Sequence, residues 1–185
     1  MKINRQKLIT ILSQYPLYLC LLLLLLGCQS PQLKQTKQIQ VTRVISGQSL
    51  EAKLVDNQQI SHSNLKIRLI GINSPDLRQN PWGESAKEQL EKLIAQTNGL
   101  VSLETEQSAT DNFGRILAYV WQNKTLLNES LVKQGYVLAD WEFPHRYGER
   151  LLAAQRYARI MGYGIWQPQN PLRIEPKQFR RKNSA

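Results

Sequence analysis

The sequence contains few of the residues from which the commonest metal centres and nucleophilic sites are built. It has two cysteines, Cys20 and Cys28, and two histidines, His62 and His145. The histidines are far apart and neither has a cysteine close by, so no Cys/His metal-binding pattern is present in the sequence. Gly-rich phosphate loops and serine–histidine nucleophile motifs are also absent from it. We therefore interpret both histidines as surface residues and look for chemistry among arginines, carboxylates and amides.

Long hydrophobic runs are missing as well, apart from one near the start of the chain. Residues 17–26 form an apolar block that is about half the length of the ~20 residues needed to span a bilayer as a helix. The residues before it include Lys2, Arg5 and Lys7 and no acid, which is typical of a signal peptide. The block leads into LLGC at residues 25–28. This ending resembles a bacterial lipoprotein signal, in which the cysteine is acylated and becomes the new N-terminus.

We therefore predict a lipoprotein signal peptide over residues 1–27, lipidation of Cys28 and an anchor on the exported face of a bacterial membrane. Extending the apolar stretch back to residue 8 gives ~20 residues, so an uncleaved anchor is the alternative. Cleavage would remove Cys20 and exclude an intrachain disulfide, so the mature domain would be stable through its core alone. Residues 28–38 show no periodicity and predict a flexible tether.

Negative charge is scarce. The chain has 24 Lys and Arg against 14 Asp and Glu, a formal net charge of +10, and removing the three cations of residues 1–27 leaves +7. A basic surface attracts polyanions and speeds their encounter with the protein. However, many exported proteins are basic, and the tether and the C-terminal tail hold several of these charges. Charge alone therefore does not identify nucleic acid as the partner.

The remaining chain predicts one domain of the α+β class, mainly β, over residues 39–181, with a short tail at 182–185. Apolar patterning predicts five strands, at residues 39–45, 49–55, 65–72, 100–106 and 116–121. Helical periodicity predicts one helix that begins with Asn80 as its cap and Pro81 in first position, and two more over residues 126–134 and 146–161. The Pro-rich segment 167–181 is expected to be non-helical. Together, these predicted strands and helices indicate a five-stranded barrel with about three helices.

The segment KIRLIGINSPD, residues 66–76, brings a cation and a carboxylate to the end of one strand. Arg68 lies within the strand, and Gly71 interrupts its pattern, as a bulge or a close backbone approach would. Pro75 ends the strand because it cannot donate a ladder hydrogen bond. Asp76 follows on the turn. These residues could hold a phosphate and a water molecule, although an ordinary barrel strand could also contain them.

Further segments in a fixed order make the pattern more specific. VTRVISGQSL (residues 41–50) precedes it, and PWGE (81–84), DNFGRILAYV (111–120) and GIW (164–166) follow it. This order and spacing resemble the staphylococcal nuclease (thermonuclease) family over roughly residues 40–181. The resemblance implies an OB-fold-like barrel, hydrolysis of phosphodiesters in DNA and RNA, and calcium as the cofactor.

By this resemblance, Arg68 and Arg115 correspond to the two phosphate-binding, catalytic arginines of the family. A planar guanidinium can bind two phosphate oxygens at once, which a lysine cannot do. Asp76 corresponds to the catalytic glutamate, which positions or deprotonates the attacking water. Aspartate is one methylene shorter, and a misplacement of this size can cost on the order of 100-fold in rate. The alternatives are a surface salt bridge for either arginine and an ordinary turn role for Asp76.

The expected metal site departs further from the family. The family usually has acids where this chain has Gln48 and Asn73, and threonine where it has Ser74. All three keep oxygen atoms, and amide oxygens can bind calcium, but the negative charge on which calcium affinity depends is lost. We therefore expect a degenerate, weak calcium site, with Asp76 as the one acid at its centre and Asp111 on its rim.

Two functions are compatible with these residues. The first is a membrane-anchored, thermonuclease-like enzyme with weakened catalysis, and the second is a catalytically inactive nucleic-acid-binding or interaction module on the same fold. We favour the first, with catalysis impaired because Gln48 and Asn73 replace acids. Both predict single-stranded DNA or RNA as the partner, bound through its phosphates without base preference. We expect the protein to be a monomer.

Overall fold

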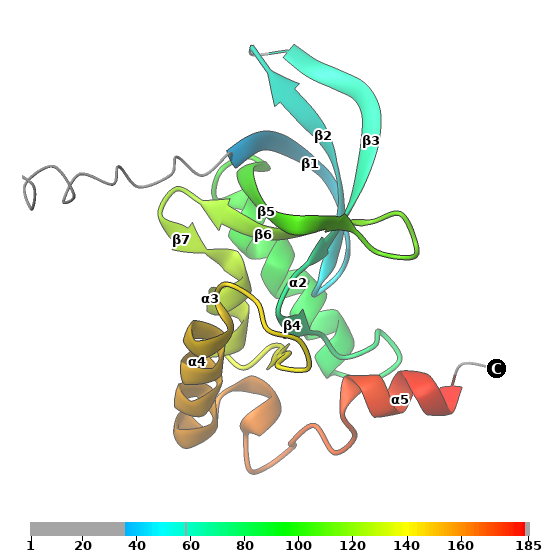
Figure 1. The fold of residues 1–185 in the computed structure, drawn as a ribbon. Coiled ribbons are helices and arrows are strands. Elements are labelled where there is room, and N and C mark those ends of the chain that lie inside the picture. Colours follow the sequence, from blue (N-terminus) through cyan, green and yellow to red (C-terminus); the bar gives the residue numbers. More distant parts are fainter. Residues whose placement is uncertain (1–35, 58, 184–185) are drawn as a thin grey trace, which may run out of the picture. The chain divides into compact units, whose positions relative to one another are not determined.

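Five strands close into a barrel in the computed structural model, which describes residues 36–57 and 59–183 (Figure 1). These strands are β1 (Thr36–Ser46), β2 (Ser49–Asp56), β3 (Gln59–Leu69), β5 (Leu100–Thr110) and β6 (Ile116–Gln122). β2 pairs with β1 and β3, and β5 pairs with β1 and β6, all antiparallel. A parallel pairing of β3 with β6 closes the barrel, with Arg68 opposite Leu117. The expected mainly β, OB-fold-like barrel is confirmed.

Short strands and helices extend the barrel at one end. β7 (Thr125–Leu126) continues β6 as a hairpin, and β4 (Ile72–Asn73) pairs with β8 (Leu138–Ala139). The described helices are α2 (Trp82–Ala95), α3 (Leu127–Lys133), α4 (Gly148–Met161) and α5 (Pro176–Asn183), with a 3₁₀ turn, η1 (Gly164–Trp166). In Figure 1, α3 and α4 lie side by side, and α5 is the red helix near the C-terminus. None of the helices in the described part of the chain is long and apolar enough to cross a membrane.

The core lies inside the barrel and under the helices. Leu50, Ile67 and Tyr119 from the strands are fully buried, as are Leu90 of α2 and Leu151 of α4. Burying a large apolar side chain contributes roughly 1.5–3 kcal/mol relative to leaving it exposed. The buried stripe of α2 is the one that its helical periodicity predicts: Trp82, Ala86, Leu90, Leu93 and Ile94.

The segment around Gly71 differs from the single strand expected over residues 65–72. β3 ends at Leu69, a turn follows, and β4 begins at Ile72. Gly71 has φ +71°, and a Cβ added there would lie 2.4 Å from the His145 ring. The interruption is therefore a close backbone approach in a left-handed turn, where an L side chain would be strained.

Several boundaries are corrected by the structure. Asn80 does not cap α2, whose cap position is Pro81 with no side-chain capping bond. β1 begins at Thr36, so the expected tether overlaps the strand by three residues. The expectation of a non-helical C-terminal segment is wrong for α5, because Pro176 stands at the first helical position, where the missing N–H costs nothing. The signal peptide and Cys28 lie outside the described residues.

Candidate active site

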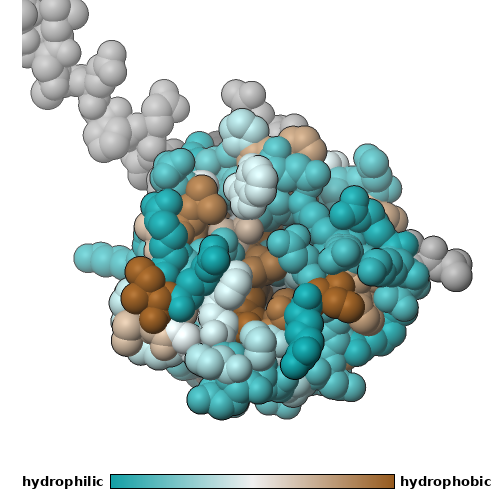
Figure 2. Space-filling model, turned by 90° about the horizontal axis from the view of Figure 1, so that it is seen from below, coloured by the Kyte–Doolittle hydropathy of each residue, from teal (hydrophilic) through white to brown (hydrophobic). Residues whose placement is uncertain are grey.

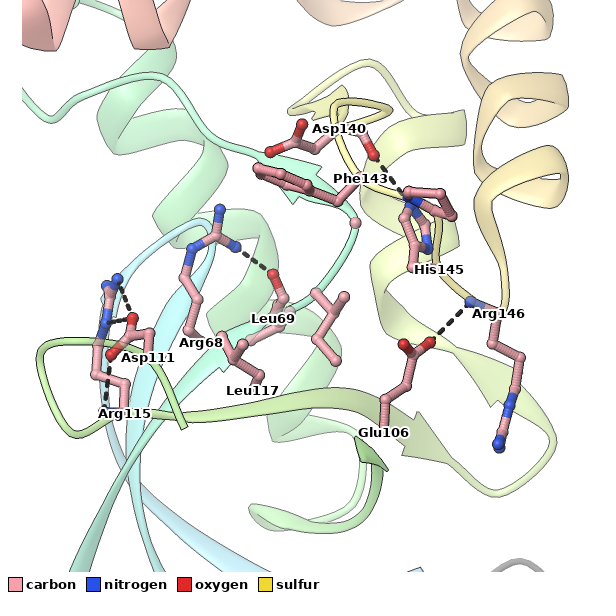
Figure 3. A pocket seen from close by; sticks show the side chains of 13 residues that line it. Arg68, Leu69, Glu106, Asp111, Arg115, Leu117, Asp140, Phe143, His145 and Arg146 are labelled. Carbon is pink, nitrogen blue, oxygen red and sulfur yellow. Dashed lines mark hydrogen bonds and ion pairs between the residues drawn. The ribbon is translucent and has the colours of Figure 1, made fainter. Parts of the chain in front are cut away.

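A cavity of about 870 Å³ opens beside the parallel β3–β6 pair. Arg68 and Leu69 line it from β3, Arg115 from the turn before β6, and Leu117 from β6. The loop before α4 provides the opposite side (Figure 3). The parallel register brings Arg68 and Arg115 to the same edge of the barrel. Figure 3 shows their side chains rising next to each other toward the cavity. Two cations far apart in the sequence therefore share one concave site.

Arg115 is positioned by the turn that precedes β6. Its Nε donates to Asp111 Oδ2 at 2.8 Å, and its Nη1 donates to Ser49 Oγ at 3.3 Å. Asp111, expected on the rim, lines the cavity and also accepts the backbone N–H of Arg115 at 3.0 Å. Gly114, with φ +71°, allows the tight turn that makes these contacts possible.

Arg68 is half-buried and is held by backbone oxygens. Its Nη1 donates to Leu69 O, and its Nη2 donates to Ile72 O at 2.6 Å. No carboxylate of residues 36–57 and 59–183 lies within ion-pair distance of it. Burial lowers the pKa of Arg68 to about 10, with the neighbouring Arg115 and Arg180 acting in the same direction, so the group is still cationic at pH 7. Asp140 and Asp111 raise this pKa in the opposite direction, but they are paired with Lys177 and Arg115. A half-buried guanidinium without a paired carboxylate gains from an anionic ligand.

Asp76 lies on the turn after β4 and not in the lining of the cavity. Arg78 holds both of its carboxylate oxygens, with Nε 2.8 Å from Oδ1 and Nη2 3.2 Å from Oδ2. The backbone N–H of Arg78 also donates to Oδ1 at 3.1 Å. Arg78 lowers the pKa of Asp76, against partial burial, which raises it. The carboxylate is therefore ionised but engaged, and its contacts are those of a turn residue.

The three residues expected to ligate calcium lie together, but oxygen atoms of all three already accept hydrogen bonds from N–H groups. Gln48 Oε1 accepts the backbone N–H of Ser74 at 2.6 Å. Asn73 Oδ1 accepts from Nη2 of Arg180, and Ser74 O accepts from Nη1 at 3.0 Å. In the described part of the chain, no three His, Cys, Asp or Glu side chains are grouped to hold a metal. A donor set without carboxylates, with a guanidinium bonded to it, does not fit calcium.

Two residues at this site were not expected from the sequence. Arg180 comes from α5, in a segment expected to be non-helical, and only the Arg-Arg pair at 180–181 hints at it. His145, expected on the surface, is half-buried in the cavity lining. Its Nδ1 lies 3.0 Å from Tyr119 Oη and its Nε2 lies 3.0 Å from Asp140 O. No sequence signal indicated these contacts, because they depend on how the loop before α4 packs. His62 is exposed, as expected.

Hydrophilic side chains dominate the face seen from below, and hydrophobic side chains form separate small groups around a hollow (Figure 2). Two exposed aromatic rings accompany the site. Phe143, 74% exposed, lines the cavity, and Phe113, 82% exposed, lies with its ring centre 5.4 Å from the guanidinium carbon of Arg115. Cations beside exposed rings are the combination that single-stranded nucleic acids bind without base preference.

Comparison with known proteins gives consistent matches. The sequence model of the family described as staphylococcal nuclease homologue matches residues 66–168. A thermonuclease of Staphylococcus hyicus is 33% identical over 132 residues, covering 68% of this chain and 73% of that protein. An uncharacterized endonuclease of Haemophilus influenzae is 30% identical over 161 residues, covering 87% and 83%. Protein ParB of Escherichia coli is 30% identical over 155 residues, covering 78% and 80%.

Proposed function

This chain belongs to the staphylococcal nuclease family, and we propose from this that it binds single-stranded DNA or RNA through Arg68 and Arg115 and cleaves its phosphodiesters slowly. Family membership supports a nuclease-type function. The observation that carries the proposal for this chain is the cavity in which Arg68, without a carboxylate partner among the described residues, lies beside Arg115. Asp111 and Asp140 in the cavity lining are paired with Arg115 and Lys177, so a phosphodiester would supply the anionic partner that Arg68 lacks.

Arg68 and Arg115 would act on the phosphate itself. A guanidinium has five N–H donors, and Arg68 uses two of them on backbone oxygens, so the others are available to phosphoryl oxygens. Two cations aimed at these oxygens neutralise the charge that develops as water attacks phosphorus. Because the protein holds them in place before the substrate arrives, little reorganisation is needed during the reaction.

The weak part of the proposed reaction is activation of water. Asp76 stands in place of a longer glutamate, and both of its oxygens are engaged by Arg78. Gln48 and Asn73 offer neutral oxygens where the family usually has acids, and these oxygens already accept hydrogen bonds. No step is therefore assigned to calcium. The same contacts favour the second candidate, a binding module without catalysis, if Asp76 never leaves Arg78.

A digest of single-stranded DNA distinguishes these functions. The purified protein is incubated with an end-labelled oligonucleotide in calcium or in chelator, and cleavage and binding are both measured. We expect binding and slow cleavage that calcium does not accelerate, and loss of both in the double variant Arg68→Ala/Arg115→Ala, which also controls for contaminating nuclease. Binding without any cleavage would favour the inactive module. Fast cleavage that requires calcium would contradict the proposed weakening, and absence of binding would contradict both functions.

We also propose that the domain is anchored to a bacterial membrane on its exported face by a lipid on Cys28. The proposal is supported by the charged start, the short apolar block and the LLGC ending of residues 1–28. An anchored basic domain would meet nucleic acid outside the membrane that holds it.

A further inference from the structure

Arg180 lies where the family resemblance leads one to expect the divalent cation. Its Nη2 donates to Asn73 Oδ1 and its Nη1 donates to Ser74 O at 3.0 Å. Asn73 and Ser74 are two of the three residues expected to ligate calcium, and the third, Gln48, is joined to Ser74 by a 2.6 Å hydrogen bond. A positive charge from the protein therefore occupies the oxygen cluster that a metal would need.

We infer that Arg180 is a third phosphate-binding cation of this site and that it makes nucleic-acid binding independent of a divalent metal. The inference rests on the proposed function, because it concerns the anion that Arg68 and Arg115 would bind. Arg180 is not in the cavity lining and lies beside it, on Asn73 and Ser74. It adds a residue from the C-terminal helix α5, which lies outside residues 66–168 that the family model matches.

The hydrogen bonds of three guanidinium groups meet on two short segments. Arg68 donates to Ile72 O, one residue before Asn73, to which Arg180 donates. Arg115 donates to Ser49 Oγ, one residue after Gln48, which the Ser74 backbone N–H contacts. Residues 48–49 and 72–74 thus connect all three cations. The electrostatic effects agree with this placement, because Arg115 and Arg180 both lower the pKa of Arg68.

Arg180 has no carboxylate partner among the residues that the structure describes. The nearby acids are bound to other cations: Asp76 to Arg78, and Asp140 to Lys177 at 3.0 Å. Burial lowers the pKa of Arg180 and Arg115 lowers it further, against the opposite effect of the two acids. Half-buried cations that repel one another are stabilised when an anion binds between them. A phosphodiester is such an anion.

α5 is attached firmly enough to present Arg180 in a fixed position. Lys177 bonds Asp140 and Glu142. The backbone before the helix is held by Gln79, whose Nε2 donates to Ile174 O at 2.8 Å. A cation fixed before the ligand arrives contributes more to binding than a mobile one. Two of the five N–H donors of Arg180 are in use, which leaves three for an anionic ligand.

Fluorescence anisotropy with a labelled single-stranded oligothymidylate tests the inference. Dissociation constants of the parent, Arg180→Gln, Arg180→Lys and Lys182→Gln are measured in calcium and in chelator over a range of salt. Lys182 is the matched control, because it is exposed on the same helix and carries the same charge. Circular dichroism of each variant checks that the fold is kept.

We expect the parent to bind equally well in both buffers. Arg180→Gln should weaken binding about tenfold and reduce the slope of log affinity against log salt by about 0.7, the value for one lost phosphate contact on a single strand. Arg180→Lys should recover the slope and part of the affinity, because it keeps the charge without the planar fork. Lys182→Gln should change affinity by less than about twofold.

The possible failures are distinguishable. A parent that binds in neither buffer would overturn the proposed function and the inference together. A parent that binds only with calcium would overturn the inference and leave the proposed function intact. If Arg180→Gln is correctly folded and binds as tightly as the parent, the inference is overturned and the proposed function stays intact. Tighter binding by this variant would also overturn the inference, because it would show that Arg180 only blocks the site.

Discussion

The carboxylate of Asp76 and the guanidinium of Arg78 face each other as a two-pronged ion pair, with Nε 2.8 Å from Oδ1 and Nη2 3.2 Å from Oδ2. Only Leu77 separates the partners in sequence, so the turn itself presents the pair. By the family resemblance, Asp76 stands where a glutamate that activates water is expected. The arrangement keeps it ionised while engaging the oxygens with which it would act.

Replacing Arg78 tests this arrangement through pH. Arg78 lowers the pKa of Asp76 below its ordinary 3.8, so the pair adds stability above pH 3.8 that is lost as pH falls through the lower, folded pKa. We expect Arg78→Gln to raise the Asp76 pKa toward 3.8, measured by carboxyl NMR titration. In the pH profile of any cleavage, the pH below which the rate falls should move upward. At neutral pH the cleavage rate should increase, because Arg78 no longer engages the Asp76 carboxylate.

Arg43→Gln is the control for this titration, because Arg43 forms a similar exposed pair with Glu51 at 3.0 Å on the barrel surface. It should leave the Asp76 pKa unchanged. An Asp76 pKa that is the same in the parent and in Arg78→Gln would show that the two side chains are not paired in solution.

The proposed phosphate-binding role of Arg68 and Arg115 leads to a second prediction. Arg68→Ala and Arg115→Ala should each weaken binding of a nucleoside bisphosphate at least about tenfold, because each removes charge-assisted hydrogen bonds. Isothermal titration calorimetry measures the affinities, and Arg43→Ala serves as a surface arginine control. Affinities that stay within twofold of the parent in both site variants would show that the cavity does not bind phosphate.

The family resemblance was enough to predict that Arg68 and Arg115 act together, and the parallel pairing of β3 with β6 brings them to one edge of the barrel. The break at Gly71 was predicted from its place in a β-branched run as a bulge or a close backbone approach, and the structure shows the close approach. The helix α5 could not be predicted from the sequence, because its position depends on long-range contacts such as Lys177 with Asp140. Local proline content argued against a helix, whereas Pro176 in fact begins one. Arg180 could therefore not be assigned to the site from sequence.

Gly71 makes a third prediction, on stability. Gly71 and Gly114 both have φ +71°, but an added Cβ meets the ring of His145 at 2.4 Å and Leu151 at 2.7 Å in the first case, and nothing within 4 Å in the second. Gly114→Ala should cost about 1–2 kcal/mol from backbone strain alone. Gly71→Ala should cost a further ~1–3 kcal/mol through overpacking. Urea unfolding measures the loss in free energy of unfolding for both variants. Equal losses would show that the structure around Gly71 accommodates the added methyl group without an energetic penalty.

The N-terminal segment makes a fourth prediction. If Cys28 is lipidated, Cys28→Ser should abolish incorporation of a labelled fatty acid and leave unprocessed precursor in the membrane fraction. Cys20→Ser, within the apolar block, should be processed and lipidated like the parent. Mature protein with an unmodified N-terminus at another residue would exclude the lipoprotein signal.

The expected calcium site makes a fifth prediction, in which acids alone are not sufficient. Gln48→Glu and Asn73→Asp add two carboxylates, and the glutamate keeps the length with which Gln48 reaches the Ser74 N–H. With Arg180 present, we expect no calcium binding, because its guanidinium would form an ion pair with the new aspartate and repel the metal. Calorimetric titration with calcium tests the double variant.

Removing the guanidinium of Arg180 from this double variant should then allow calcium to bind. With the two acids in place, Arg180→Ala should produce calcium binding, since affinity in oxygen sites rises with the number of carboxylates once no cation competes for them. Lys182→Ala in the same background removes an exposed charge from the same helix and should produce none. Adding Asp76→Glu to the calcium-binding variant restores the missing methylene and should raise calcium-dependent cleavage by on the order of 100-fold. Calcium binding by the two acids with Arg180 still present, or none after its removal, would show that Arg180 does not occupy the metal position.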